Sequence, residues 1–203
     1  MGRPRRFQES DVVDDAVRQF WKSGYLGTSI TDLLNATGLQ RGSLYKAFDD
    51  KHSLFEAALG VYLRSGRVTT RRVLEGEGAP LDRLRDWLKQ ALEGCAGAEG
   101  GPSGCLAVNS MIELAPSDKR IRIRLARHWS VVEGSLTRTL AEGQRVGEIR
   151  DDVPARELAQ LIIRMIAGVA VFMRQGRRGS VGRTLLQLVG ASRNGHSTGV
   201  VST

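Results

Sequence analysis

The sequence predicts an all-α protein. Apolar residues recur every three or four positions along most of the 203 residues, which is the period of a helix with one buried face. No run of useful length alternates between apolar and polar residues, as a strand would. Glycine, proline and polar residues separate the helical stretches. We expect an N-terminal three-helix unit at 1–50, a larger helical domain at 51–192, and a disordered tail at 193–203, with about nine helices in all.

The first helices have recognisable ends. The first helix stops at Gly24, because glycine adopts the conformation that ends a helix at little cost. Thr28 or Ser29 can cap the second helix, and Asp32 in its first turn favours the positive end of the helix dipole. Gly38 then turns the chain into a third, short helix. A fourth helix begins near residue 50, and the later helices are expected near 81–95, 105–114, 118–147, 154–175 and 180–191.

Composition and charge set limits on function. Hydrophobic residues make up 41% and charged residues 26% of the chain, as in ordinary globular proteins. The formal net charge is +8, but residues 1–51 hold 8 Lys/Arg and 7 Asp/Glu, so the excess lies in the C-terminal half. The apolar stretch 161–173 is shorter than the ~20 residues that span a bilayer, and no signal peptide is evident. We expect a cytoplasmic protein without membrane contact or cofactor.

Residues 30–48 have the pattern of a helix-turn-helix, with two short helices joined at Gly38. The second helix of this motif enters the major groove of DNA, and its first residues meet base edges. Glutamine pairs with adenine and arginine with guanine through two hydrogen bonds each. Lys51 opens the next helix, where a phosphate can bind. The other candidate DNA-contacting residues of this segment are Gln40, Arg41, Gly42, Ser43, Tyr45 and Lys46.

The same segment resembles the DNA-binding domain of the tetracycline-repressor (TetR) family. The matching residues are GRPR at 2–5, Phe20, GY-x-x-TS-x-x-DL at 24–33, TG at 37–38, GSLY-x-x-F at 42–48 and DK-x-x-LF at 50–55. We therefore add Thr28 to the candidate DNA contacts. Arg3 and Arg5 belong to a basic arm that could lie along a groove of DNA, and the alternative is that this arm is a solvated tail. Many members of the family carry a ring before the last Phe, where this chain has Ala47, and Lys46 could supply that contact.

The resemblance implies that the larger domain forms a dimer and binds a small molecule. Residues 158–173 are apolar nearly all round, so this helix is buried either in a dimer interface or in the core of one chain. The expected interface residues are Leu161, Met165, Gly168, Phe172, Leu185, Leu186 and Val189. The expected ligand contacts, for which ordinary core packing is the alternative, are Tyr62, Trp87, Met111, Trp129 and Met165. Asn109 and Glu113 either supply polar anchors or face solvent.

Cys105 follows a glycine-rich loop and begins a helix, where the helix dipole lowers the pKa of a thiol. Its surroundings, GCLAVN, resemble a branch of the family that includes repressors switched by electrophiles or oxidants. Cys95 lies across the loop and could resolve an oxidised Cys105. The alternative is that Cys105 is a small buried apolar residue.

These observations together predict a ligand-responsive TetR-like regulator. We expect a homodimeric repressor that binds a pseudo-palindromic double-stranded operator, and a small apolar or aromatic effector or thiol modification that releases it. A DNA-binding protein of low sequence specificity without an effector is the alternative. An enzyme is disfavoured, because the three histidines are scattered and no Ser-His-Asp, zinc or phosphate-loop spacing occurs.

Overall fold

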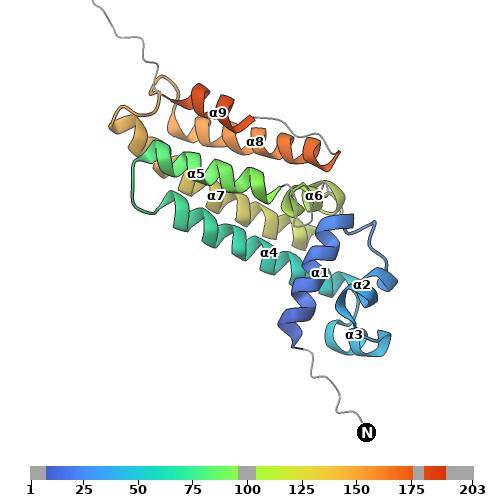
Figure 1. Ribbon diagram of the computed structural model, residues 1–203. Coiled ribbons are helices and arrows are strands. Elements are labelled where there is room, and N and C mark those ends of the chain that lie inside the picture. The colour runs from blue at the N-terminus through green and yellow to red at the C-terminus, as the bar shows by residue number, and fades with distance from the viewer. Residues whose placement is uncertain (1–7, 96–103, 176–180, 191–203) are drawn as a thin grey trace, which may run out of the picture.

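The computed structural model describes residues 8–95, 104–175 and 181–190, and these ranges hold nine α-helices and no strand (Figure 1). The predicted all-α fold is confirmed. The basic arm with Arg3 and Arg5, most of the glycine-rich loop and the tail 193–203 lie outside the described residues. The helices are α1 (Glu9–Ser23), α2 (Ile30–Thr37), α3 (Arg41–Phe48), α4 (Lys51–Leu74), α5 (Pro80–Gly94), α6 (Leu106–Glu113), α7 (Lys119–Arg145), α8 (Ala155–Arg174) and α9 (Val181–Val189).

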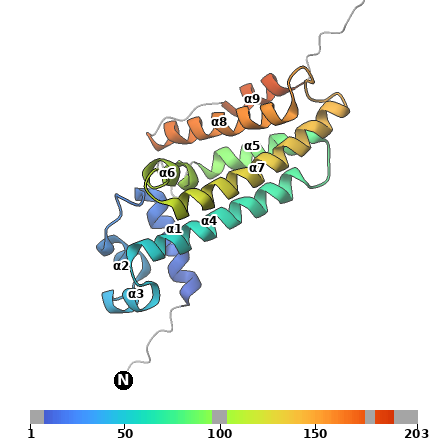
Figure 2. The same ribbon diagram turned by 180° about the vertical axis from the view of Figure 1, so that it is seen from behind.

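The helices form an elongated bundle with α1, α2 and α3 gathered at one end (Figures 1 and 2). Helix α4 starts among these three helices and runs along the bundle beside α7 and α5. Helices α8 and α9 cover the side of the bundle opposite α4, and short α6 lies where α1 meets the bundle. One end of the molecule therefore presents α3, and the rest is a helical body.

The ends of α1 and α2 follow from the local sequence. Gly24 has φ 76° and donates its N–H to the Phe20 carbonyl, and Gly38 has φ 66° and donates to that of Leu34. Ser29, rather than Thr28, caps α2: its hydroxyl accepts the Asp32 N–H, and the Asp32 carboxylate accepts the Ser29 N–H in return.

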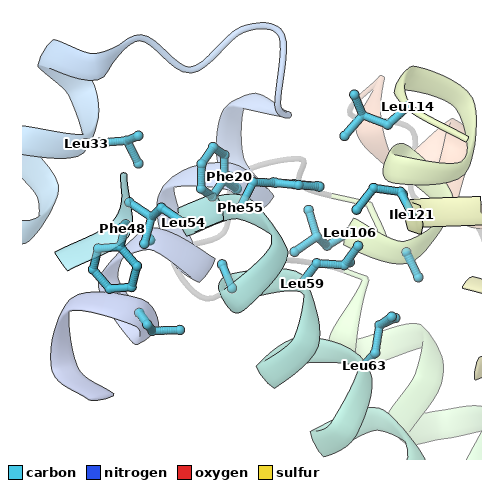
Figure 3. Packing of buried hydrophobic residues seen from close by; sticks show 14 of the residues in the cluster. Phe20, Leu33, Phe48, Leu54, Phe55, Leu59, Leu63, Leu106, Leu114 and Ile121 are labelled. Carbon is cyan, nitrogen blue, oxygen red and sulfur yellow. The ribbon is translucent and has the colours of Figure 1, made fainter. Parts of the chain in front are cut away.

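A single hydrophobic cluster joins the N-terminal helices to the body (Figure 3). Phe20 of α1 meets Phe55 of α4 edge-on, with ring centroids 5.0 Å apart, and both side chains are fully buried. Leu33 of α2 lies on one side of this pair, and Leu106 of α6 and Ile121 of α7 lie on the other. The boundary expected at residue 50 thus falls inside a continuous core.

A second cluster fills the body between α5, α7, α8 and α9. Leu185 and Val189 of α9 belong to it and are almost completely buried within one chain. They were expected in the dimer interface, and this expectation is wrong for a physical reason: the apolar face of α9 packs inward against α5 and α8. None of the described helices is both long and apolar enough to cross a bilayer.

The shared cluster makes Phe55 a sensitive position. Phe55→Ala should lower the free energy of unfolding by about 3–5 kcal/mol, because the cavity lies between α1 and α4 and cannot collapse. The measurement is urea unfolding followed by circular dichroism. Val68→Ala is the control, since Val68 is exposed on the same helix and should change stability by less than about 0.5 kcal/mol. Equal effects of the two substitutions would contradict the assignment.

Candidate functional site

Helix α3 buries one face and exposes the other. Leu44 and Phe48, four residues apart, lie in the shared cluster, and the helix packs against α4. Gln40 is the N-cap of this helix. The remaining expected DNA contacts of the segment are exposed on its free side together with Gln40: Arg41, Gly42, Ser43, Tyr45 and Lys46.

The N-terminus of α3 is open to an anion. Its N-cap, Gln40, makes no side-chain cap bond, and no acidic residue stands in the first turn. The positive end of the helix dipole is therefore uncompensated by the chain itself. A side chain at Gly42 would meet no neighbouring atom within 4 Å, so a flat surface can approach the backbone closely at this point.

Lys51 and Thr28 are placed differently from the α3 residues. The Lys51 ammonium lies 4.3 Å from the centroid of the Tyr25 ring, and partial burial lowers the pKa of Lys51. Thr28 is only 1% exposed, and its hydroxyl donates to the Gly24 carbonyl at 2.6 Å. The expected contact of the Thr28 side chain with DNA is corrected, because that hydroxyl is already used inside the α1–α2 turn.

Helix α6 holds the α1–α2 turn. The Glu113 carboxylate accepts the N–H of Tyr25 at 2.7 Å and that of Leu26 at 3.2 Å. A Cβ on Gly24 would lie 2.2 Å from Glu113 Oε1, so glycine is required for this approach. Glu113 is therefore neither a ligand anchor nor a solvent-facing residue. Nothing local in the sequence indicates this contact across 88 positions.

The body contains a cavity of about 370 Å³ between α1, α4, α5, α7 and α8. Tyr62, Trp87 and Trp129 line it, as do both cysteines. Met111 and Met165 do not line it. Met111 is 40% exposed on the outside of α6, and Met165 packs against the cluster between α8 and its neighbours. The expectation that these two methionines face the cavity is corrected, because helical spacing does not show which face of α6 or α8 turns inward.

The described residues of the cavity wall include no Asp, Glu, Lys or Arg. His128, which sequence reasoning set aside, is part of the wall; burial and then the charge of nearby Arg67 lower the pKa of His128 to about 4. His128 is therefore neutral at physiological pH. Its Nδ1 and the Nε1 of Trp129 are both buried without a hydrogen-bond partner in the described part of the chain.

The two thiols are held together in the cavity wall. The Tyr62 hydroxyl donates to Cys105 Sγ at 3.5 Å, and Cys105 is the N-cap of α6. A hydrogen bond from Cys95, helped by those from Tyr62 and the first N–H groups of α6, outweighs desolvation and lowers the pKa of Cys105 to about 6. The same pairing and burial raise the pKa of Cys95 far above its ordinary value. Cys105 is thus the more acidic thiol of the pair.

An apolar stripe runs along the outside of α8. Leu161, Met165, Gly168 and Phe172 recur at intervals of four, three and four, and Leu161 and Phe172 are 47% and 54% exposed. Leu186 of α9 is half-buried against the second cluster. Leu188, which was not among the expected interface residues, is exposed instead.

A helix-turn-helix at one end of a helical body defines a DNA-binding regulator. Residues 12–58 match the family model described as bacterial regulatory proteins, tetR family, and residues 80–184 match the tetracyclin repressor-like C-terminal domain. The chain therefore belongs to the TetR family of transcriptional regulators.

Individual relatives agree with this assignment. The chain is 30% identical over 176 residues to the HTH-type transcriptional repressor ComR of Escherichia coli K12, covering 86% of this chain and 83% of that one. A TetR transcriptional regulator from Chloroflexus aurantiacus has a TM-score of 0.74 at 27% identity, over 90% and 96% of the two chains. A cysteine mutant of the regulator CifR, complexed with 26-bp operator DNA, has a TM-score of 0.77 at 25% identity, over 93% and 100%.

The thiol geometry predicts a pH profile. The rate of Cys105 alkylation by iodoacetamide should rise through pH about 6 and level off above it, because the thiolate is the reactive form. Cys95→Ala should move this inflection upward, since it removes a hydrogen bond donated to the thiolate. Mass spectrometry of the labelled peptide follows the reaction, with Cys105→Ser as the blank. An inflection near ~8.5, the ordinary value for a free thiol, would contradict the assignment.

Proposed function

We propose that the protein is a cytoplasmic transcriptional repressor that binds a pseudo-palindromic operator as a homodimer and leaves it when the body cavity is occupied or Cys105 is modified. The observation that carries the DNA-binding part is the exposed face of α3, which pairs an uncapped N-terminus with basic, polar and glycine residues. Its apolar face is fixed in the core, so the reading face has a defined orientation.

Within α3 the residues divide by chemistry. Arg41 and Gln40 stand at the start of the helix, where side chains reach base edges and can form paired hydrogen bonds with guanine and adenine. Tyr45 and Lys46 lie one turn further, where a hydroxyl and an ammonium suit phosphates. Lys51 already stacks on Tyr25, and in this arrangement it contributes charge to a nearby phosphate rather than reading a base.

Arg41→Ala tests sequence reading. It should cost about 1–3 kcal/mol on the operator and relax the preference at one base position, because a bidentate contact is lost. The measurement is fluorescence anisotropy on DNA from upstream of the gene against a scrambled duplex at the same salt concentration. Arg145→Ala removes an exposed arginine at the far end of α7 and is the control. Equal losses on both duplexes would favour the alternative of a DNA binder with low specificity.

The apolar stripe on α8 supports the dimer. Soluble proteins rarely leave such a stripe in water, and a two-fold partner presenting the same face would cover it. The proposed interface contains Leu161, Met165, Gly168 and Phe172, where Gly168 permits close approach, with Leu188 and Leu186 beside it. A two-fold arrangement would place two α3 helices about 34 Å apart, one turn of DNA.

Phe172→Asp should convert the dimer to monomers at micromolar concentration, since a carboxylate would be buried against an apolar partner. Sedimentation velocity distinguishes the two states. Val68→Asp places the same charge on an exposed valine of α4 and should leave the dimer intact. A Phe172→Asp protein that remains dimeric would refute this interface.

The cavity favours an uncharged, flat effector. Trp87 and Trp129 offer apolar faces. The described wall has no Lys or Arg to balance an anionic ligand, which the Cys105 thiolate would also repel. The unpaired His128 Nδ1 and Trp129 Nε1 favour a ligand with one hydrogen-bond donor and one acceptor. A phenolic aldehyde, whose hydroxyl donates and whose carbonyl accepts, should therefore weaken operator binding more than the corresponding phenolic carboxylate, and the reverse order would rule out this chemistry.

Helix α6 supplies the route from the cavity to the reading helix. Cys105 in the cavity wall caps its N-terminus, and Glu113 at its other end holds the α1–α2 turn. A group added at Cys105 would need the space that Tyr62 now occupies. Because Cys105 is the N-cap of α6, breaking its contact with Tyr62 would move α6. Loss of the Glu113 contact would then release the α1–α2 turn from α6.

Modification of Cys105 should release the operator. After reaction with N-ethylmaleimide we expect operator affinity to fall about 5- to 150-fold, the range of an ordinary coupling free energy of ~1–3 kcal/mol. Cys95→Ser should keep this response and Cys105→Ser should lose it. Before the reaction, both variants should bind the operator as tightly as the unaltered protein. Anisotropy titrations measure the change. Unaltered affinity of the fully modified protein would reject the thiol switch and leave the DNA-reading proposal untouched.

A further inference from the structure

A second hollow lies on the surface of the body, between α4 and α7, and shares no residue with the cavity or with the α3 surface. It has a volume of about 230 Å³. Its rim is formed by Arg64 and Arg67 of α4 and by Arg124 and Arg127 of α7, over a floor that includes Gly60 and Leu63. These two helices pack side by side in the fold, so the four guanidinium groups come from both walls.

In the lining of this hollow, both helices carry basic residues and no acidic ones. Residues 57–74 contain four arginines and no carboxylate, and residues 119–132 contain five lysines and arginines and no carboxylate. Arg124 lies 4.0 Å from the Glu56 carboxylate and donates to the Glu56 carbonyl. Arg64, Arg67 and Arg127 form no ion pair within the described part of the chain, so like charges face one another without compensation.

The shape of the hollow limits what can neutralise this charge. Gly60 leaves space at its floor: a Cβ there would meet only Arg124 Nη1, at 3.7 Å. The hollow is smaller than the ~300–1,000 Å³ typical of drug-sized ligands, so its ligand is compact. Arginine forms paired, charge-assisted hydrogen bonds with phosphoryl oxygens, and three or four converging guanidinium groups suit more than one such group.

We propose that this hollow binds a compact oligophosphate, a molecule with at least two linked phosphoryl groups that bridge α4 and α7. Inorganic pyrophosphate and a nucleoside diphosphate share this chemistry. The ligand would draw the two helices together near the middle of α4, and α4 carries the reading unit at its N-terminal end. Regulation of operator binding by this anion rests on the proposed function, whereas the binding itself does not.

Isothermal titration calorimetry of the full chain at ~150 mM salt tests the binding, since surface attraction alone is largely screened there. The titrants are pyrophosphate, a nucleoside diphosphate, and orthophosphate as the single-phosphoryl control. Pyrophosphate should bind, and orthophosphate should bind at least about tenfold more weakly because it cannot span both walls. If the nucleoside diphosphate binds as tightly as pyrophosphate, the hollow recognises only the phosphoryl groups. If the nucleoside diphosphate binds more tightly, the hollow also recognises the nucleoside, and the ligand is a nucleotide.

Matched variants decide whether the hollow is the site. Arg64→Gln with Arg127→Gln should weaken pyrophosphate binding about tenfold or more, because two charged donors are removed. Arg71→Gln with Arg145→Gln removes the same charge from exposed positions of the same helices outside the hollow, and should change binding less than threefold. Equal losses in the two pairs would show general attraction and overturn the proposal.

Gly60→Leu separates shape from charge. It keeps every arginine and favours the helix, but fills the floor of the hollow. Pyrophosphate binding should be lost in this variant while its unfolding temperature is retained. Undiminished binding by Gly60→Leu, or no binding by the unaltered protein, would overturn the proposal. Operator affinity measured on the same proteins without anion should match the unaltered chain, so failure here is distinguishable from failure of DNA binding.

Discussion

The edge-on contact of Phe20 with Phe55 fixes where α1 crosses α4, and the other functional contacts depend on that crossing. With α1 held there, its C-terminal turn reaches Glu113, and Trp21 can donate its indole N–H to the Gly104 carbonyl at 2.8 Å. The helices that present α3 thus share buried surface with the helices around the cavity. In the described residues, packed side chains therefore join the body to the helices that present α3.

Helix α6 concentrates this connection in eight residues. Its first N–H groups stabilise the Cys105 thiolate, and its last residue accepts two backbone N–H groups from the α1–α2 turn. Both contacts are electrostatic and both involve helix or turn backbone, so their strength depends on where the short helix sits. A small shift of α6 would therefore change the contacts of Cys105 and of Glu113 together. The close-packed apolar clusters on either side of α6 limit how far it can shift.

The sequence was informative about local features and poor at tertiary ones. Helical period and glycine caps predicted the helices, and the motif predicted which side of α3 is exposed. Thr28 and Leu185 were misplaced because the same residue types occur on inward and outward faces, and only the neighbours decide which. Glu113 was beyond reach, because its partners lie 88 positions away and its spacing within α6 carries no signal of them.

The length of α4 has a geometric consequence. Its 24 unbroken residues form a rod of about 36 Å at ~1.5 Å per residue. A tilt of about 5° at the body end would displace the reading end by about 3 Å. Hydrogen bonds to base edges tolerate only a few tenths of an ångström around ~2.9 Å. In the proposed operator complex α4 would therefore act as a lever, and a change in the body too small to disturb its packing would be enough to abolish the fit of α3 to its groove.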